Sequence, residues 1–262
     1  MRTVLQVFGV GFLVMLLVGL VLFVMICRVP QRYPRGPLTP EQQRQARDRL
    51  ESHILEFGNK AGAGEPFAWT ITAGQANAYL ASLDAIAEPF DHPAYPSVEM
   101  ERAGFAGPAV GMHDGVLTFM IRVIRYDKIF SVDMAFESDG QGSLTVRTLG
   151  MRVGALPVPQ SLLAEVHERV RHHLAGQLAE VEKAEGGSIG QVPLRRFARL
   201  LRNIVGMLGG QYVSPELVWP FGNHRVRIDR VEIKEGELTL HVVPVRHRRH
   251  EAATAPAPAG GE

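Results

Sequence analysis

Cysteine is almost missing from this chain, which limits the crosslinks and metal sites that it can form. The sequence of 262 residues contains a single cysteine, Cys27. One cysteine excludes a disulfide within the chain and a zinc site held by several cysteines. It also removes the usual indication of an oxidising or a reducing compartment.

An excess of charge of one sign is missing as well. Lysine and arginine together number 28 and aspartate and glutamate 27, so the formal net charge is only +1. This balance predicts no general attraction to nucleic acid. With 46% hydrophobic and 21% charged residues, the composition is that of a globular protein rather than a disordered or fibrous one.

The sequence also has no motif whose context points to catalysis or metal binding. A GxxxxGK[ST] phosphate loop does not occur, and the serine in GGSIG (residues 186–190) follows no buried strand. The stretch HERVRHH does not fit a zinc helix, because position i+4 from His167 is Arg171. We therefore predict a protein that is not an enzyme, with no catalytic residue, cofactor or metal ion.

The most conspicuous feature that is present is an uninterrupted apolar run near the N-terminus. Residues 7–27 contain no charged or strongly polar side chain. A helix of this length, at about 1.5 Å per residue, would span the hydrocarbon layer of about 30 Å. The run is too long for a cleaved signal peptide, and no small-x-small site follows it. It predicts a retained signal-anchor, and so a single-pass membrane protein with residues 1–28 as its N-terminal membrane anchor.

The composition of the remaining chain predicts three further regions. Residues 29–39 are rich in proline and predict a stiff juxtamembrane linker. Residues 40–250 carry the periodicities of a folded α+β domain. Residues 251–262, EAATAPAPAGGE, are of low complexity and predict a disordered tail.

Local patterns predict where the first two helices of the domain begin. Thr39 with Gln42, and Thr72 with Gln75, have the spacing of capping boxes, in which each side chain satisfies a backbone N–H at the helix start. The first helix is expected to end at Gly58. A short strand, FAWTI, is expected between the two helices.

The rest of the domain predicts a sheet with helices over it. Alternating apolar residues between 115 and 153 predict about three antiparallel strands, and a closing hairpin is expected to turn at Glu235 and Gly236. Residues 160–183 and 193–208 predict long amphipathic helices. The predicted fold class is therefore α+β: an N-terminal transmembrane helix followed by an antiparallel sheet of β-hairpins covered by long amphipathic helices.

A proline-rich step joins the predicted sheet to the first of these helices. Gly150 and Gly154 relieve crowding where the last strand ends, and Pro157 and Pro159 cannot donate ladder hydrogen bonds. Because the step contains no nucleophile, acid or metal ligand, we interpret it as a structural corner.

One helix face carries a cluster of basic residues. No acidic residue occurs between Pro193 and Gln211, and four arginines lie along the predicted helix there. One interpretation is an ordinary solvated face. The alternative, contact with the anionic head groups of a membrane surface, is assigned to Arg195, Arg196, Arg199 and Arg202.

Several fragments together resemble a known family. These are the apolar N-terminal run, WTITAGQANAYLA, DGVLTF followed by RTLGMRVGALPVPQSLL, and VEIKEGELTLHVVP. The set resembles the YpmS-like bacterial proteins, single-pass membrane proteins of unknown function. The resemblance implies a location at the bacterial cytoplasmic membrane with the domain outside, and it brings no catalytic residue. The arginines that flank the apolar run favour the opposite orientation, since Arg2 precedes it while Arg28, Arg32 and Arg35 follow it.

The predicted function is binding of a lipid or acyl chain by a non-enzymatic envelope protein, in an apolar groove between sheet and helices. The strand that contains VLTFMIRVIRY places Met120 and Ile124 on the face expected to be wet, and such a face must be covered by something. The alternative is that the helix over 160–183 covers this face and leaves no cavity.

Two other functions stay open from the sequence. The alternative is a scaffold or assembly factor that docks another envelope protein. The third option is an enzyme whose carboxylates are brought together only by folding. The expected partners are accordingly the lipid bilayer, a lipid ligand or an envelope protein, and not nucleic acid.

Overall fold

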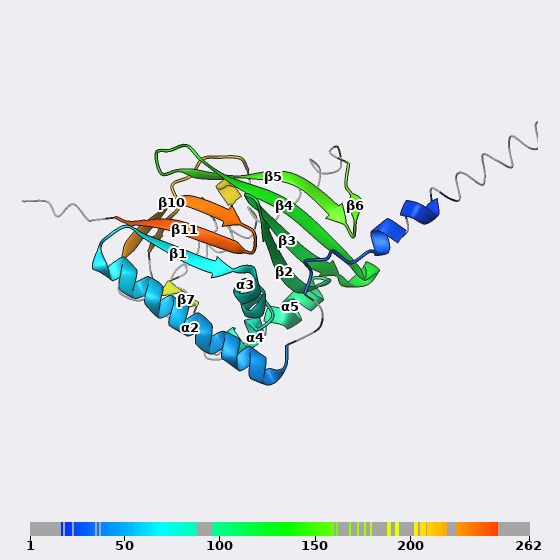
Figure 1. The fold of residues 1–262 in the computed structure, drawn as a ribbon, viewed down its shortest axis with the longest axis horizontal. Helices are drawn as coiled ribbons and strands as arrows, with labels where there is room; N and C mark the ends of the chain where they lie inside the picture. The colour runs from blue at the N-terminus through cyan, green and yellow to red at the C-terminus, as the bar shows by residue number, and fades with distance from the viewer. Residues whose placement is uncertain are drawn as a thin grey trace, which may run out of the picture.

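The computed structural model (Figure 1) describes most of the chain between residues 24 and 245. The described residues are 17, 19–22, 24–34, 36, 38–87, 96–159, 161, 168, 172, 176, 179, 188–189, 192–193, 202–203, 205–207, 209–218 and 224–245.

The described residues form an α+β structure built on two antiparallel sheets rather than one. Sheet A has the strand order β1-β11-β10-β9, with bounds Phe67–Thr72, Glu237–Pro244, Arg225–Lys234 and Glu216–Val218. Sheet B has the order β2-β3-β4-β5-β6, with bounds Phe105–His113, Val116–Val123, Lys128–Ser138, Leu144–Val153 and Leu156–Pro157. A separate small hairpin pairs β7 (Ser188–Ile189) with β8 (Val192–Pro193).

Helix α2 (Pro40–Ala63) packs against sheet A (Figure 1) and forms a buried core with it. Phe57 and Ala61 on the helix contact Val226 and Val242 on the sheet. The ring of Phe57 also meets the ring of Trp69 edge to face, with centroids 5.7 Å apart. Sheet A is therefore held by burial of an apolar helix face.

The two predicted capping boxes are confirmed, and one predicted helix end is wrong. Each cap is reciprocal, with the threonine hydroxyl accepting from the N3 backbone and the glutamine side chain accepting from the threonine N–H. Helix α2 does not stop at Gly58 but continues to Ala63, because the residue in the left-handed conformation that ends it is Gly64, with φ 76°. The apolar face of the helix is thereby long enough to bring Ala61 into the core.

Three short helices follow β1 and pack between α2 and β2. They are α3 (Ala73–Leu80), α4 (Leu83–Ala87) and α5 (Pro96–Arg102). Helix α3 contacts β2, the edge strand of sheet B, through the side chain of Asn77. This side chain forms two hydrogen bonds to the backbone of one residue of β2, as a neighbouring strand would. The Asn77 amide donates to the Val110 carbonyl at 2.9 Å, and its carbonyl accepts from the Val110 N–H at 2.7 Å. This pair satisfies backbone groups of an edge that would otherwise stay unpaired.

Strand β2 was not expected from the sequence, and its composition explains why. FAGPAVGMH contains two glycines and a proline, which are poor strand formers. Pro108 lies in a β-bulge, since the pairing with β3 jumps from Ala106 to Ala109. Proline is tolerated at such a bulge on an edge strand because no ladder hydrogen bond is required of it there.

The two sheets meet through their hairpin turns. The predicted closing hairpin is confirmed, with Lys234 opposite Glu237 across the turn. Its Gly236 N–H donates to the Met112 carbonyl at 3.0 Å, and the Gly115 N–H of the β2–β3 turn donates to the Ile233 carbonyl at 2.9 Å. The positions of sheets A and B are thus tied by backbone hydrogen bonds at one corner.

The expected membrane anchor is corrected. Among the residues that the structure describes, no helix is both long and apolar enough to cross a membrane. Within the expected anchor at 7–27, the described residues begin at Leu17 and the helix ends at Cys27. That no described helix could cross a membrane contradicts the predicted transmembrane helix, the single-pass signal-anchor and the location in the bacterial cytoplasmic membrane.

The chain that follows this helix lies on sheet B rather than standing away from it. We call residues 25–33 the N-terminal segment. It runs beside β6 and crosses the proline-rich corner (Figure 1), where the Ala155 N–H donates to the Met25 carbonyl at 2.8 Å. Gly154, with φ +62°, is so close to the segment that an added Cβ would lie 2.3 Å from the Ile26 carbonyl oxygen. The corner is therefore the place where the N-terminal segment docks.

Replacing Gly154 by alanine is expected to detach the N-terminal segment. The methyl group would collide with backbone, and the left-handed conformation costs a non-glycine residue about 1–2 kcal/mol. We expect thermal unfolding to lose at least about 1 kcal/mol of stability, and limited proteolysis to cut near residues 25–33. Gly150→Ala is the matched control, because nothing lies within 4 Å of a Cβ there. Equal stability of the two variants would contradict the close crossing.

The bridge from α3 to β2 makes a second prediction. Asn77→Ala removes both hydrogen bonds to Val110 and leaves two backbone groups unpaired, which is expected to cost about 1–3 kcal/mol. Asn77→Asp keeps an acceptor for the Val110 N–H but loses the donor to the Val110 carbonyl. Chemical denaturation should therefore place Asn77→Asp between wild type and Asn77→Ala. An Asn77→Ala variant as stable as wild type would refute the role of this side chain.

Candidate functional site

Sheet B has two chemically different faces near its junction with the N-terminal segment. In β4 and β5 successive side chains point to opposite faces, and the register pairs Phe130 with Val153 and Ser131 with Arg152. Val123 of β3 lies opposite Lys128. One face is therefore mostly apolar, whereas the other carries both polar and apolar side chains, only one residue apart along each strand.

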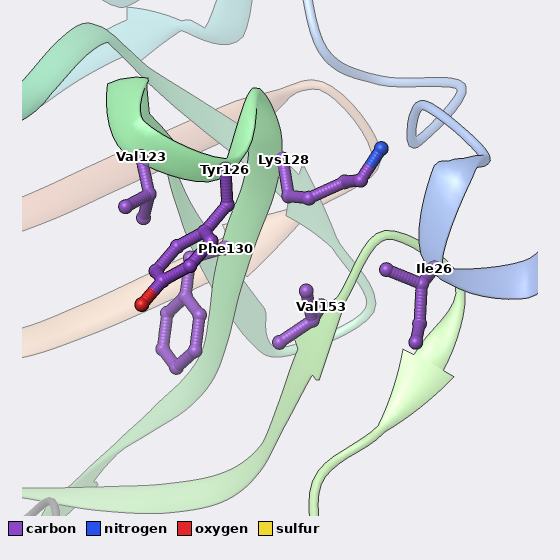
Figure 2. Close-up of a pocket in the computed structure, with 6 residues that line it drawn as sticks. All are labelled: Ile26, Val123, Tyr126, Lys128, Phe130 and Val153. Atoms are coloured by element: carbon purple, nitrogen blue, oxygen red, sulfur yellow. The ribbon is translucent and has the colours of Figure 1, made fainter. Parts of the chain in front are cut away.

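An apolar pocket of about 440 Å³ opens on the first face. Figure 2 shows its six lining residues, which are Ile26, Val123, Tyr126, Lys128, Phe130 and Val153. All of them except Lys128 are aliphatic or aromatic. The walls come from three parts of the chain, because Ile26 belongs to the N-terminal segment and Val153 to the corner. The volume lies within the range of about 300–1,000 Å³ typical of small-molecule sites.

The rim of this pocket combines exposed apolar side chains with basic groups. Tyr126 is 63% exposed and lies in the short 3-10 helix η2 (Ile124–Tyr126) between β3 and β4. The Arg125 guanidinium lies 5.6 Å from the centre of the Tyr126 ring, a cation–π distance. The Lys128 amine donates to the Cys27 thiol at 3.2 Å. Arg125 and Lys128 are basic and only Asp127 between them is acidic, so this stretch of the rim favours a negatively charged group.

The opposite face is covered by the N-terminal segment. Tyr33 packs against a buried cluster of Ala109, Met120 and Ile129, and its hydroxyl donates to the Gly107 carbonyl at 2.7 Å. Met120 is only 1% exposed, so this face is covered, as expected for a strand that is apolar on both faces. The side chain that covers it comes from the proline-rich stretch predicted as a spacer.

A polar network lies on the same covered face. The Asp133 carboxylate accepts from the Thr118 hydroxyl at 2.7 Å and from the Arg152 guanidinium at 2.8 Å. Its side chain is only 17% exposed, so the ion pair to Arg152 is partly shielded from water. The network fixes the orientation of Arg152 beside Ser131, its partner in the register.

Of the four arginines predicted to touch a membrane surface, the structure describes one. Arg195, Arg196 and Arg199 lie outside the described residues. Arg202 is helical and exposed. Their role stays a prediction.

The histidine-rich stretch shows no metal geometry where it is described. The described part of the chain contains no group of three or more His, Cys, Asp or Glu side chains arranged to hold a metal ion. His172 lies on a helix with its Nε2 3.7 Å from the Glu168 carboxylate, and its side chain is 80% exposed. Ser188 of GGSIG falls in β7, a two-residue strand.

The pocket residues were only partly visible in the sequence. The alternation of β3 and β4 predicts that Val123 and Phe130 share a strand face with other apolar side chains, which is a signal for burial. Nothing in the sequence places Ile26 beside them, since it lies in the run interpreted as a membrane helix. Lys128 belongs to no sequence motif that would indicate a binding site.

Comparison with protein-family models, with curated proteins and with solved structures finds no match to this chain. The resemblance to the YpmS-like proteins therefore stays a prediction.

The half-buried phenol of Tyr33 makes the docked segment sensitive to alkaline pH. Burial raises the pKa of Tyr33 above its ordinary 10.0, and the charge of Arg122 opposes the shift. Because the folded pKa is the higher one, the stability linked to this group is complete below about pH 10 and is lost as the pH rises through the folded value. We expect the free energy of unfolding to fall less steeply above about pH 10 in Tyr33→Phe than in wild type. Identical slopes in urea titrations at several pH values would contradict this assignment.

Proposed function

We propose that the protein binds the acyl chain of a negatively charged amphiphile in the apolar pocket of sheet B. The observation that carries the proposal is the pocket itself, a hollow of about 440 Å³ with an amine at its rim. Burial of an acyl chain there removes apolar surface from water, at roughly 25 cal/mol per Å².

The occupant is indicated by the distribution of charge. The floor of the pocket is formed by Val123, Phe130 and Val153, which offer no hydrogen bond to a polar ligand. Lys128 at the rim, with Arg125 nearby on η2, offers positive charge to a head group that remains in water. An acyl chain with a carboxylate or phosphate at one end matches both parts.

Calorimetric titration of the purified full chain with dodecanoate and with dodecanol tests the proposal. We expect saturable binding of dodecanoate and weaker binding of the uncharged alcohol. Lys128→Gln should lower the affinity for dodecanoate about two- to fivefold, the value of an exposed ion pair, and leave the affinity for dodecanol unchanged.

Filling the pocket provides the sharper test. Val153→Phe places a larger side chain in the lining and is expected to weaken both ligands about tenfold or more. Leu149→Phe is the control on the same strand, because Leu149 is exposed and does not line the pocket. The proposal is refuted if neither ligand binds wild type, or if Val153→Phe binds as well as Leu149→Phe does. Failure of both ligands would leave docking of another protein as the better function.

A further inference from the structure

A second cavity, also of about 440 Å³, lies on the opposite face of sheet B beneath the N-terminal segment. Its floor is made by side chains of three adjacent strands, Thr118, Met120, Ser131 and Arg152, and its roof by residues 28–32. Gly154 and Ala155 of the corner close one side. We call this second cavity the oxyanion cavity. It shares no lining residue with the apolar pocket.

The floor of the cavity contains a buried hydroxyl without a partner. Ser131 is 2% exposed, and its Oγ has no hydrogen bond in the described structure. Leaving such a group unpaired is unfavourable, and nearly all buried polar groups in proteins find a partner. Its neighbour Arg152 uses one guanidinium nitrogen for Asp133, and the four remaining N–H groups of a guanidinium can serve another acceptor.

The charges around the cavity do not balance. Three arginines line it, Arg28, Arg32 and Arg152, whereas Asp133 and Glu235 are the carboxylates that pair with them. Arg32 is engaged with Glu235 at 3.0 Å. Arg28 is exposed and forms no ion pair with any residue that the structure describes. One positive charge is therefore left over at the mouth of the cavity.

We infer that the oxyanion cavity binds a phosphate group, held by Arg28 and Arg152 and by a hydrogen bond from the Ser131 hydroxyl. Guanidinium groups present paired N–H donors that match phosphate oxygens, and hydrogen bonds between charged partners are among the stronger ones in proteins. The phosphate belongs either to a free phosphate ester or to the head group of an anionic lipid, because the recognising chemistry is the same. This site is separate from the proposed acyl-chain pocket and does not depend on it.

Two ligands distinguish the sources of the phosphate. Glycerol 3-phosphate is titrated calorimetrically into the full chain, and flotation is measured with phosphatidylcholine vesicles that contain or lack phosphatidylglycerol. Saturable binding of glycerol 3-phosphate supports a soluble ester. Binding only to vesicles with phosphatidylglycerol supports a lipid head group.

Two substitutions connect the binding to the cavity. Arg28→Gln and Ser131→Ala are each expected to weaken whichever ligand binds by about tenfold, the value of a hydrogen bond to a charged group. Neither should disturb the fold, because Arg28 is exposed and the Ser131 hydroxyl has no partner to lose. Arg225→Gln is the matched charge control, since Arg225 is an exposed residue at the start of β10 in sheet A.

The inference is overturned if neither ligand binds up to about 10 mM, or if Arg28→Gln has no larger effect than Arg225→Gln. If Ser131→Ala does not fold, Arg28→Gln against its control still decides the matter. Dodecanoate binding, measured on the same variants, should be unchanged. Loss of phosphate binding with dodecanoate binding intact therefore separates this inference from the proposed function.

Discussion

The contact on which the candidate sites depend is the close crossing of the N-terminal segment over Gly154. No side chain fits between the Ile26 carbonyl and the corner, and the Met25 carbonyl accepts a hydrogen bond from the next residue, Ala155. This crossing places Ile26 in the wall of the apolar pocket and Arg28 in the roof of the oxyanion cavity. The corner contains no reactive group of its own, yet it positions the chain that completes both cavities.

The predicted helix starts and the predicted closing turn, which depend on neighbouring residues, were confirmed. The capping boxes of α2 and α3 and the turn at Glu235 and Gly236 are set by hydrogen bonds and dihedral angles within a few residues, so the sequence displays them directly. Predictions that depended on distant pairing failed or could not be made. Strand β1 pairs with β11, more than 160 residues away in the chain, and nothing in FAWTI specifies that partner.

The candidate site was predictable only where the alternation of residues within a single strand indicates which of its faces is buried. Val123 and Phe130 stand out by alternation, but the residue that covers Met120 could not be predicted, for a physical reason. A strand with apolar side chains on both faces reveals that each face is covered, without revealing by what. The cover proved to be Tyr33, from a stretch whose proline content suggested an extended spacer. Proline favours extended backbone whether or not that backbone lies against a sheet, so composition cannot separate the two cases.

The shared segment also links the two proposed ligands energetically. Each cavity is complete only when residues 25–32 lie on sheet B, because Ile26 lines one and residues 28–32 roof the other. A ligand that binds only the docked state stabilises that state, by an amount set by its difference in affinity for the docked and undocked states. Binding in either cavity then favours binding in the other, and the coupling must be equal in both directions. An amphiphile on the apolar face of sheet B and a phosphate on the opposite face would thus affect each other's binding through the crossing of the N-terminal segment over Gly154, although the two ligands touch no residue in common.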